Sequence, residues 1–341
     1  MSKRKLTFVV LMSVLSAIVL SILIFYIVIF SFSSKEGKND TIFPKELASW
    51  NSMIDDNTLI TELVMPGSHD AGCYNMMYMA ETQEYDIYGQ LIRGARYFDI
   101  RVNNDNGEYV IFHNVINGVK YDSVLEDIKK FMSEYPSEFI ILDFQHFKNE
   151  SENKVFDMLE DKIGKEKLII NENGEKQIDN LTLGEVRGKI LVTAGTNIED
   201  YDREYLFNRN NSTVNENNSV LHSYYETKLN SYSSKKFISL SLSEYIARQK
   251  IVNSGLFVLQ GQLTDNLLLR GPRFREATHS ENMSKYVKSL KNSEDLEYIN
   301  IVMRDFITSE KCREIIALNY YKNQVKTEYI DAFEKVFNIK N

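Results

Sequence analysis

The strongest constraint on the fold is an alternation of strand-type and helix-type segments that begins near Trp50. Short runs rich in β-branched and aromatic residues are separated by stretches with apolar residues at helical spacing, such as residues 121–136 and 309–323. The seven strand-type runs are residues 59–67, 95–102, 108–114, 138–147, 188–195, 255–264 and 297–305. Strands that alternate with helices over about 290 residues predict a parallel sheet, and this length suits a TIM-type (β/α)8 barrel.

One barrel strand is missing from this series. It is expected between Thr196 and Ser254, where residues 219–225 (SVLHSYY) and residues 237–242 (FISLSL) are the candidates. The same interval contains the Asn-rich residues 208–219, whose composition predicts a surface loop.

The N-terminus carries an uncharged apolar run from Leu6 to Phe30, about the length that a helix needs to cross a bilayer. Basic residues 3–5 precede it and place the N-terminal tail in the cytoplasm. The expected organisation is a cytoplasmic tail (1–5), a transmembrane signal anchor (6–30), a linker (31–48) and an extracytoplasmic barrel domain (49–341). A cleaved signal peptide, which would make the protein secreted, is the alternative.

Charge and cysteine content narrow the partners and the environment. The chain has 40 basic and 48 acidic residues, a formal charge of −8, and no basic stripe beyond its first five residues, so nucleic acid is excluded as a partner. Cys73 and Cys312 follow the first and last strand-type runs, which are neighbours in a closed barrel. One disulfide is therefore compatible with the sequence, as are two free thiols.

Titratable residues cluster where the predicted strands end. His69 and Asp70 follow the first run after a Pro66-Gly67 turn, and His113 follows the third. Asp99 and Arg101 share one face of the second run by strand alternation, and Asp305 ends the last. In a barrel these ends form one rim, where active sites of this fold lie. His222 and His279 are expected in loops or on the surface.

This set of residues suits the cleavage of a phosphodiester. The reaction needs a base for the attacking hydroxyl, an acid for the leaving oxygen and a cation beside the phosphoryl oxygens. His69 and His113 can share the proton transfers, Arg101 can supply the charge, and a carboxylate beside each histidine fixes its tautomer and raises its pKa. Taken alone, His69-Asp70 also suits a turn with an Asp cap, and Asp99 with Arg101 a structural ion pair.

Five strings in order, MPGSHDAG, GARYFDIRV, FHN, IILDFQHF and IVMRDF, resemble the phosphatidylinositol-specific phospholipase C X-domain superfamily. The resemblance implies a phosphoric diester hydrolase or lyase that cleaves a phospholipid at a membrane surface. By the same likeness, His69 is the general base oriented by Asp305, and His113 is the general acid oriented by Asp70. Arg101 would contact the phosphate, supported by Asp99. The adjacent residues His69 and Asp70 are then not expected to bond to each other.

The resemblance also bears on metal and on the headgroup. The calcium-dependent branch has acidic ligands where this chain has Arg101 and Gln145, so no metal and no cofactor are expected, as in the bacterial branch. Bacterial members that bind inositol have an arginine after the GKI strand and an Asp-x-Tyr, and neither is evident here. Gln145, Asp143 and Tyr224 are the candidate substrate contacts, although Asp143 and Gln145 equally suit a buried hydrogen-bond network.

Two other functions stay open. A glycerophosphodiester or sphingolipid phosphodiesterase on the same barrel would use a divalent ion with an acidic pair, typically Glu-x-Asp, where this chain has Asp99-x-Arg101. A non-catalytic barrel that binds lipid or protein would be expected to lack a catalytic His or Arg, and both are present.

Overall fold

The computed structural model describes residues 3–33, 36, 40, 45–171, 178–195, 203–210, 219–264 and 270–339. Its centre is a closed barrel of eight parallel strands, in which β1 pairs with β2 on one side and with β10 on the other. The barrel strands are β1 (Met65–Ser68), β2 (Tyr97–Asp105), β5 (Ile140–Lys148), β6 (Ile190–Ala194), β7 (Leu206–Asn210), β8 (Leu221–Ser223), β9 (Leu256–Gln260) and β10 (Ile301–Arg304). The predicted TIM-type barrel is confirmed.

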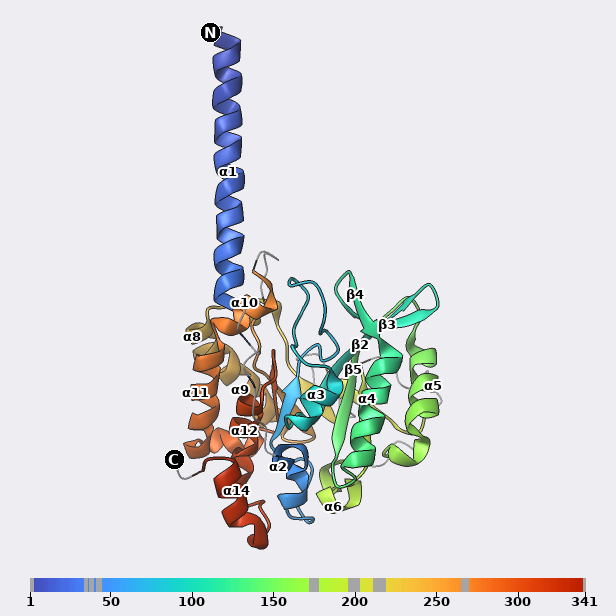
Figure 1. Cartoon of the computed structure of the whole chain (residues 1–341). Helices are drawn as coiled ribbons and strands as arrows, with labels where there is room; N and C mark the ends of the chain where they lie inside the picture. The colour runs from blue at the N-terminus through green and yellow to red at the C-terminus, as the bar shows by residue number, and fades with distance from the viewer. Residues whose placement is uncertain are drawn as a thin grey trace.

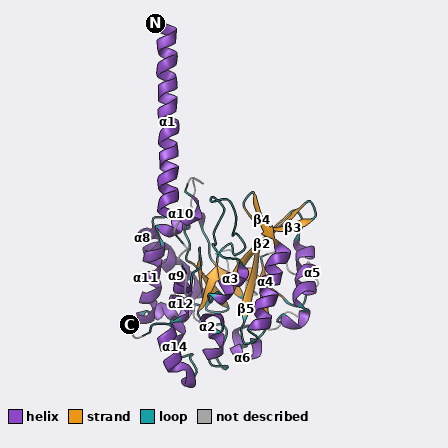
Figure 2. Cartoon of the chain, viewed as in Figure 1, coloured by secondary structure: helices purple, strands orange, loops and turns teal. Residues whose placement is uncertain are grey.

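Helix α1 (Lys3–Ser33) projects away from the barrel, and the other helices surround it, as Figures 1 and 2 show. The surrounding helices are α2 (Lys45–Ala48), α3 (Ile87–Ile92), α4 (Tyr121–Glu134), α5 (Glu152–Ile163), α6 (Leu183–Val186), α7 (Thr227–Asn230), α8 (Ser234–Lys236), α9 (Ser243–Val252), α10 (Gly271–Ala277), α11 (Ser280–Ser289), α12 (Ser309–Ile316), α13 (Leu318–Tyr321) and α14 (Ile330–Val336). The apolar stripe of α4 is buried as its spacing predicts, with Val124, Leu125 and Ile128 fully covered.

The first barrel strand begins where the sequence predicted it to end. Residues 59–62 are turns and bridges, whereas Pro66 and Gly67 lie within β1 and do not form a turn. A side chain at Gly67 would meet Ile301 Cγ2 at 2.8 Å and Tyr97 Cδ1 at 3.0 Å, so only glycine permits the close packing of β1 between its two neighbours.

Residues 108–114 are not part of the parallel barrel. β3 (Glu108–His113) pairs antiparallel with the end of β2 and continues into β4 (Ile116–Lys120), which makes a hairpin that extends beyond the barrel. Asn106 and Gly107, with φ of 53° and 95°, form the reversal between β2 and β3. The third predicted strand therefore exists, but with the opposite direction.

Two barrel strands, and not one, come from the interval between Thr196 and Ser254. β8 lies within the candidate residues 219–225, whereas Phe237–Leu242 is helical. β7 overlaps the Asn-rich stretch predicted to be a loop, of which residues 211–218 lie outside the described residues.

Cys73 and Cys312 are free and buried, so the disulfide is not present. α1 is long and apolar enough to cross a membrane, and it rises from the end of the barrel where α10 lies (Figure 1). Half of the expected linker 31–48 lies outside the described residues, namely residues 34–35, 37–39 and 41–44. Residues 31–33 belong to α1, and residues 45–48 form α2.

Candidate active site

The barrel register places the predicted residues side by side. Ser68 pairs with Arg304 on β10 and with Phe98 on β2. His69 and Asp305 directly follow β1 and β10, and Asp99 follows Phe98 on β2, so the three residues meet where β1 and β10 end. Asp70 follows with φ of 43°, a left-handed conformation that Asp tolerates better than most residues, and its buried carboxylate lies at this same end. Residues far apart in the chain thus form one cluster.

His69 forms the contact with Asp305 that the sequence predicted. Its Nδ1 lies 2.7 Å from Asp305 Oδ1, across 236 residues of chain. The other ring nitrogen, Nε2, lies 3.5 Å from Arg101 Nη2. This arrangement holds one tautomer of the ring and leaves Nε2 as the nitrogen that can exchange a proton with a ligand.

Asp70 lies near three basic side chains. Its Oδ1 lies 2.5 Å from Arg101 Nε, and its Oδ2 lies 3.4 Å from His69 Nε2 and 3.7 Å from His113 Nε2. His113 directs Nδ1 to the backbone oxygen of Ala80 at 2.8 Å. Asp70 is therefore within ion-pair distance of His113, as predicted, but the prediction that the adjacent His69 and Asp70 stay apart was wrong.

Arg101 lies between two buried carboxylates. Besides its contact with Asp70, it donates from Nε and Nη2 to the two oxygens of Asp99 at 3.1 and 2.7 Å. Burial opposes the charged form, but the two carboxylates outweigh it and raise the pKa of Arg101. Arg101 is thus a fixed positive charge, and its pairing with Asp99 suits both the structural and the supporting role.

The same charges set the protonation of His69. Burial lowers the pKa of His69, but the carboxylates of Asp70 and Asp305 outweigh burial and raise this pKa to about 9. Burial raises the pKa of Asp70, but Arg101 and the neighbouring histidines lower it to about 2. Burial raises the pKa of Asp305, against the effect of His69. The cluster at neutral pH therefore holds a charged His69 beside an ionised Asp70.

Asp143 does not line the site but contacts residues that do. It is fully buried and accepts from Tyr97 Oη at 2.5 Å and from Thr193 Oγ1 at 2.7 Å. It also forms a 2.8 Å ion pair with Arg209 Nε, while Gln145 Nε2 donates to it at 3.2 Å. Asp143 therefore positions Gln145 and Arg209, which agrees with the buried network that the sequence left open.

Two cavities lie beside His69 and His113. A cavity of about 380 Å³ is lined by His69, Asp70, Arg101 and His113 on one side and by polar side chains on the other. A smaller one of about 80 Å³ is lined by His69, His113 and Asp305 with Gly271 and Pro272. The other polar residues that line the larger cavity are Asn114, Gln145, His146, Arg209, Ser223, Tyr225, Gln260, Gln262 and Thr264.

Three predicted positions are corrected by the structure. Tyr224 is buried in the core beside Phe257 and lines neither cavity, whereas the adjacent Tyr225 lines the larger one. His222 is buried on β8, and His279 is buried with its pKa lowered to about 4, chiefly by burial. Neither histidine lies on the surface, although His279 does lie in the turn between α10 and α11, as the loop alternative predicted. Arg209 was missed, because its strand is embedded in an Asn-rich stretch.

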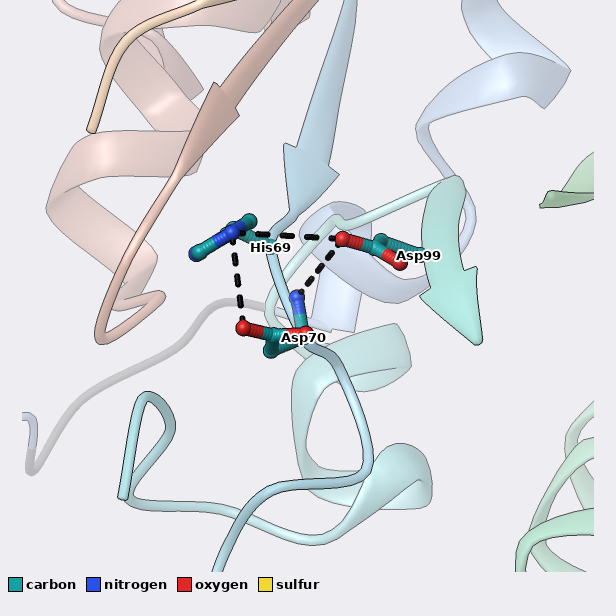
Figure 3. Close-up of side chains that lie close together, drawn as sticks. All are labelled: His69, Asp70 and Asp99. Carbon is teal, nitrogen blue, oxygen red and sulfur yellow. Dashed lines mark hydrogen bonds and ion pairs between the residues drawn. The ribbon is translucent and has the colours of Figure 1, made fainter. Parts of the chain in front are cut away.

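The only part of this cluster with metal-ligand geometry, within the part of the chain that the structure describes, is His69, Asp70 and Asp99. Figure 3 shows the three side chains close together. Their possible ligand atoms all lie within 4.8 Å of one another. Arg101 already directs its charge at both carboxylates. A divalent cation would therefore compete with a guanidinium for the same oxygens, and the set fits a metal ion poorly.

Comparison with known proteins identifies relatives of the first half of the barrel. Residues 59–195 match the family described as phosphatidylinositol-specific phospholipase C, X domain. The 1-phosphatidylinositol phosphodiesterase of Staphylococcus aureus (strain Newman) is 29% identical over 160 residues, which cover 43% of this chain and 51% of that protein. The protein of the same name from Listeria monocytogenes is 29% identical over 154 residues, covering 42% and 47%.

A solved structure extends the likeness to the whole barrel. The phosphatidylinositol-specific phospholipase C from Listeria monocytogenes has a TM-score of 0.61 at 24% identity, and the match covers 80% of this chain and 98% of that one. This likeness shows the shared fold. In sequence, the chain spans about half the length of the curated relatives it matches, and the family match ends before Arg209 and Asp305.

Proposed function

We propose that the chain, whose residues 59–195 match the phosphatidylinositol-specific phospholipase C X-domain family, is a membrane-anchored, metal-independent phosphodiesterase that cleaves phosphatidylinositol or a related phospholipid. The observation that supports this most is the cluster itself. His69 contacts Asp305 through Nδ1, and its Nε2 faces Arg101. His113 lies near Asp70, which also contacts His69, and both histidines line the larger cavity.

The proposed reaction uses these groups as base, acid and fixed charge. His69 Nε2 takes the proton from the inositol 2-hydroxyl, whose oxygen attacks phosphorus. Arg101 stabilises the added negative charge on the phosphoryl oxygens, and His113 gives a proton to the departing diacylglycerol oxygen. The products are diacylglycerol and a cyclic inositol phosphate. Asp305 and Asp70 act as positioning residues, because they contact the two histidines and not the substrate.

The experiment that tests this proposal is an assay of the full chain in detergent micelles containing phosphatidylinositol, with and without EDTA. We expect equal turnover in both conditions, because Arg101 occupies the position that a cation would need. Loss of turnover with EDTA, restored by Ca²⁺ or Mg²⁺, would favour the metal-dependent alternative. Absence of turnover on a panel of phospholipid headgroups would favour a non-catalytic barrel.

The pH dependence follows from the raised pKa of His69. Only neutral His69 can accept a proton, and with a pKa of about 9 the neutral fraction in the free enzyme increases as pH rises. Because the general acid His113 must be protonated while His69 is neutral, we expect kcat/KM to follow a bell-shaped pH profile. Asp305→Asn removes one carboxylate, so the limb that reports His69 should move to lower pH. A profile that Asp305→Asn leaves in place would contradict the assignment of His69 as base.

Arg209 is proposed to contact the headgroup, because its side chain lines the larger cavity and forms an ion pair with Asp143. That wall is otherwise neutral and polar, which suits a polyhydroxylated headgroup. Arg209→Met should raise KM for phosphatidylinositol by about tenfold or more, as expected for a lost charge-assisted hydrogen bond. Arg203→Met is the matched control, because Arg203 pairs with Asp157 and Glu160 away from the cavity. Equal effects of both variants would contradict the proposal.

Membrane anchoring is proposed from α1 and from the basic residues before it. The helix is exposed along its apolar length, and Lys3, Arg4 and Lys5 favour a cytoplasmic N-terminus with the barrel outside. Intact α1 in the mature membrane-bound protein, detected by mass spectrometry, would support an anchor. Its removal would indicate secretion.

A further inference from the structure

The end of α1 packs against the catalytic end of the barrel. Ile29 is buried, the ring of Phe30 lies 5.8 Å from that of Tyr78, and the ring of Phe32 lies 5.7 Å from that of Phe274 on α10. These contacts are made by the last turn of the apolar run. Any side chain that touches this turn lies at the depth where a spanning helix leaves the bilayer, the zone that aromatic residues favour.

Two ion pairs attach the chain beyond α1 to the same end of the barrel. Asp40 Oδ2 lies 2.7 Å from Arg93 Nε and accepts from the backbone nitrogen of Ser309 at 2.7 Å. Glu36 Oε1 lies 2.9 Å from Lys311 Nζ. All four side chains are largely buried. We call Glu36, Asp40, Arg93 and Lys311 the juxtamembrane clamp.

The juxtamembrane clamp and α10 adjoin the catalytic cluster. Lys311 Nζ also donates to the backbone oxygens of Asp305 and Phe306, at 3.0 and 2.9 Å. Gly271 and Pro272, at the start of α10, line the small cavity beside His69. The helix that emerges from the membrane thus reaches the mouth of the site directly.

Exposed apolar side chains flank this mouth. Met77 is 66% exposed in the loop after β1, and Val115 is 85% exposed at the β3–β4 turn. Figure 1 shows this hairpin at the end of the barrel from which α1 rises. Apolar side chains as exposed as these are stabilised when they leave water and enter the interfacial layer of a bilayer.

We propose that α1 and the juxtamembrane clamp hold this end of the barrel against the leaflet from which α1 emerges, so that the catalytic cavity opens onto lipids of the membrane that anchors it. Met77, Tyr78 and Val115 enter the interfacial layer. The inference rests on the anchored phospholipase proposed above and adds the orientation of its site.

The orientation can be measured without turnover. Both native cysteines are buried, so an environment-sensitive fluorophore can be placed on Met77→Cys, Val115→Cys or Ile251→Cys in the full chain, reconstituted in vesicles with and without brominated phosphatidylcholine. Ile251 is the matched control: it is 77% exposed near the end of α9, just before β9 begins at the opposite end of the barrel. We expect strong quenching at residues 77 and 115 and little at 251. Equal quenching at all three, or none at 77 and 115, would overturn the proposal.

The role of the juxtamembrane clamp is tested by Glu36→Gln with Asp40→Asn. We expect quenching at residue 115 to fall by at least half and turnover of vesicle-embedded phosphatidylinositol to fall several-fold, while turnover of a monomeric short-chain analogue stays within twofold. The matched control is Glu281→Gln with Asp295→Asn, which removes two exposed ion pairs. Unchanged quenching in the clamp variant would overturn this role. Correct quenching in a protein that cleaves neither substrate would overturn the proposed function and leave the orientation standing.

Discussion

Replacing His69 by alanine is expected to lower turnover of phosphatidylinositol by roughly 10³- to 10⁴-fold, the loss typical of a removed general base. The reason is geometric: His69 Nε2 lies beside Arg101 at the cavity, and Asp305 fixes the ring from behind. Steady-state assays of the full chain in mixed micelles measure the loss.

The control for this variant is His146→Ala. His146 lines the same cavity, and burial together with the charge of Arg101 lowers its pKa, but no role in proton transfer is assigned to it. We expect this variant to lose no more than about tenfold, since only the packing of the cavity changes. Thermal unfolding separates loss of fold from loss of chemistry. Retained activity in a folded His69→Ala protein would contradict the assignment.

Replacing Arg101 by methionine is expected to abolish turnover and also to destabilise the fold by about 3–5 kcal/mol, because a buried charge pair loses one partner. Asp70 and Asp99 are both buried and both rely on this guanidinium. Urea unfolding of the wild-type and variant proteins measures the stability, and the micelle assay measures turnover.

The pH dependence of this destabilisation provides a second check. Arg101 depresses the folded-state pKa of Asp70 to about 2, below its ordinary value of 3.8, so the associated stability is present above pH 4 and is lost as pH falls toward 2. The stability difference between wild type and Arg101→Met should therefore narrow below about pH 4.

Arg101→Lys is the matched variant, since it keeps the charge and loses the planar fork. It should recover most of the stability and little of the turnover. Full turnover with lysine would show that only charge is required at this position.

The cluster around His69 was predictable because a parallel barrel fixes where strands end. His69, Asp99 and Asp305 each directly follow or lie in a strand-type run, and closure of the barrel brings residues 69 and 305 together whatever their separation in sequence. The pattern could not give the direction of residues 108–113, because the alternation of an antiparallel hairpin strand is the same as that of a barrel-wall strand.

The other half of the site was less accessible to sequence reasoning. β7 and β8 have five and three residues, too few for a periodic pattern, and β7 lies in an Asn-rich stretch. Arg209 was therefore not predicted as a site residue. The choice of Tyr224 over Tyr225 reflects the same difficulty: β8 ends at Ser223, so strand alternation does not determine which of the next two side chains faces the cavity. Pro66-Gly67 resembled a turn because the tight packing that requires glycine is visible only in three dimensions.

The central claim is that His69, His113 and Arg101 cleave a phosphodiester by proton transfer without a metal ion. It is tested most directly by ³¹P NMR of phosphatidylinositol micelles incubated with the full chain in EDTA. The account predicts a cyclic inositol phosphate signal from the wild-type protein and none from His69→Ala. A wild-type protein that forms this product only after Ca²⁺ or Mg²⁺ is restored, or a His69→Ala protein that forms it at the wild-type rate, would contradict the account.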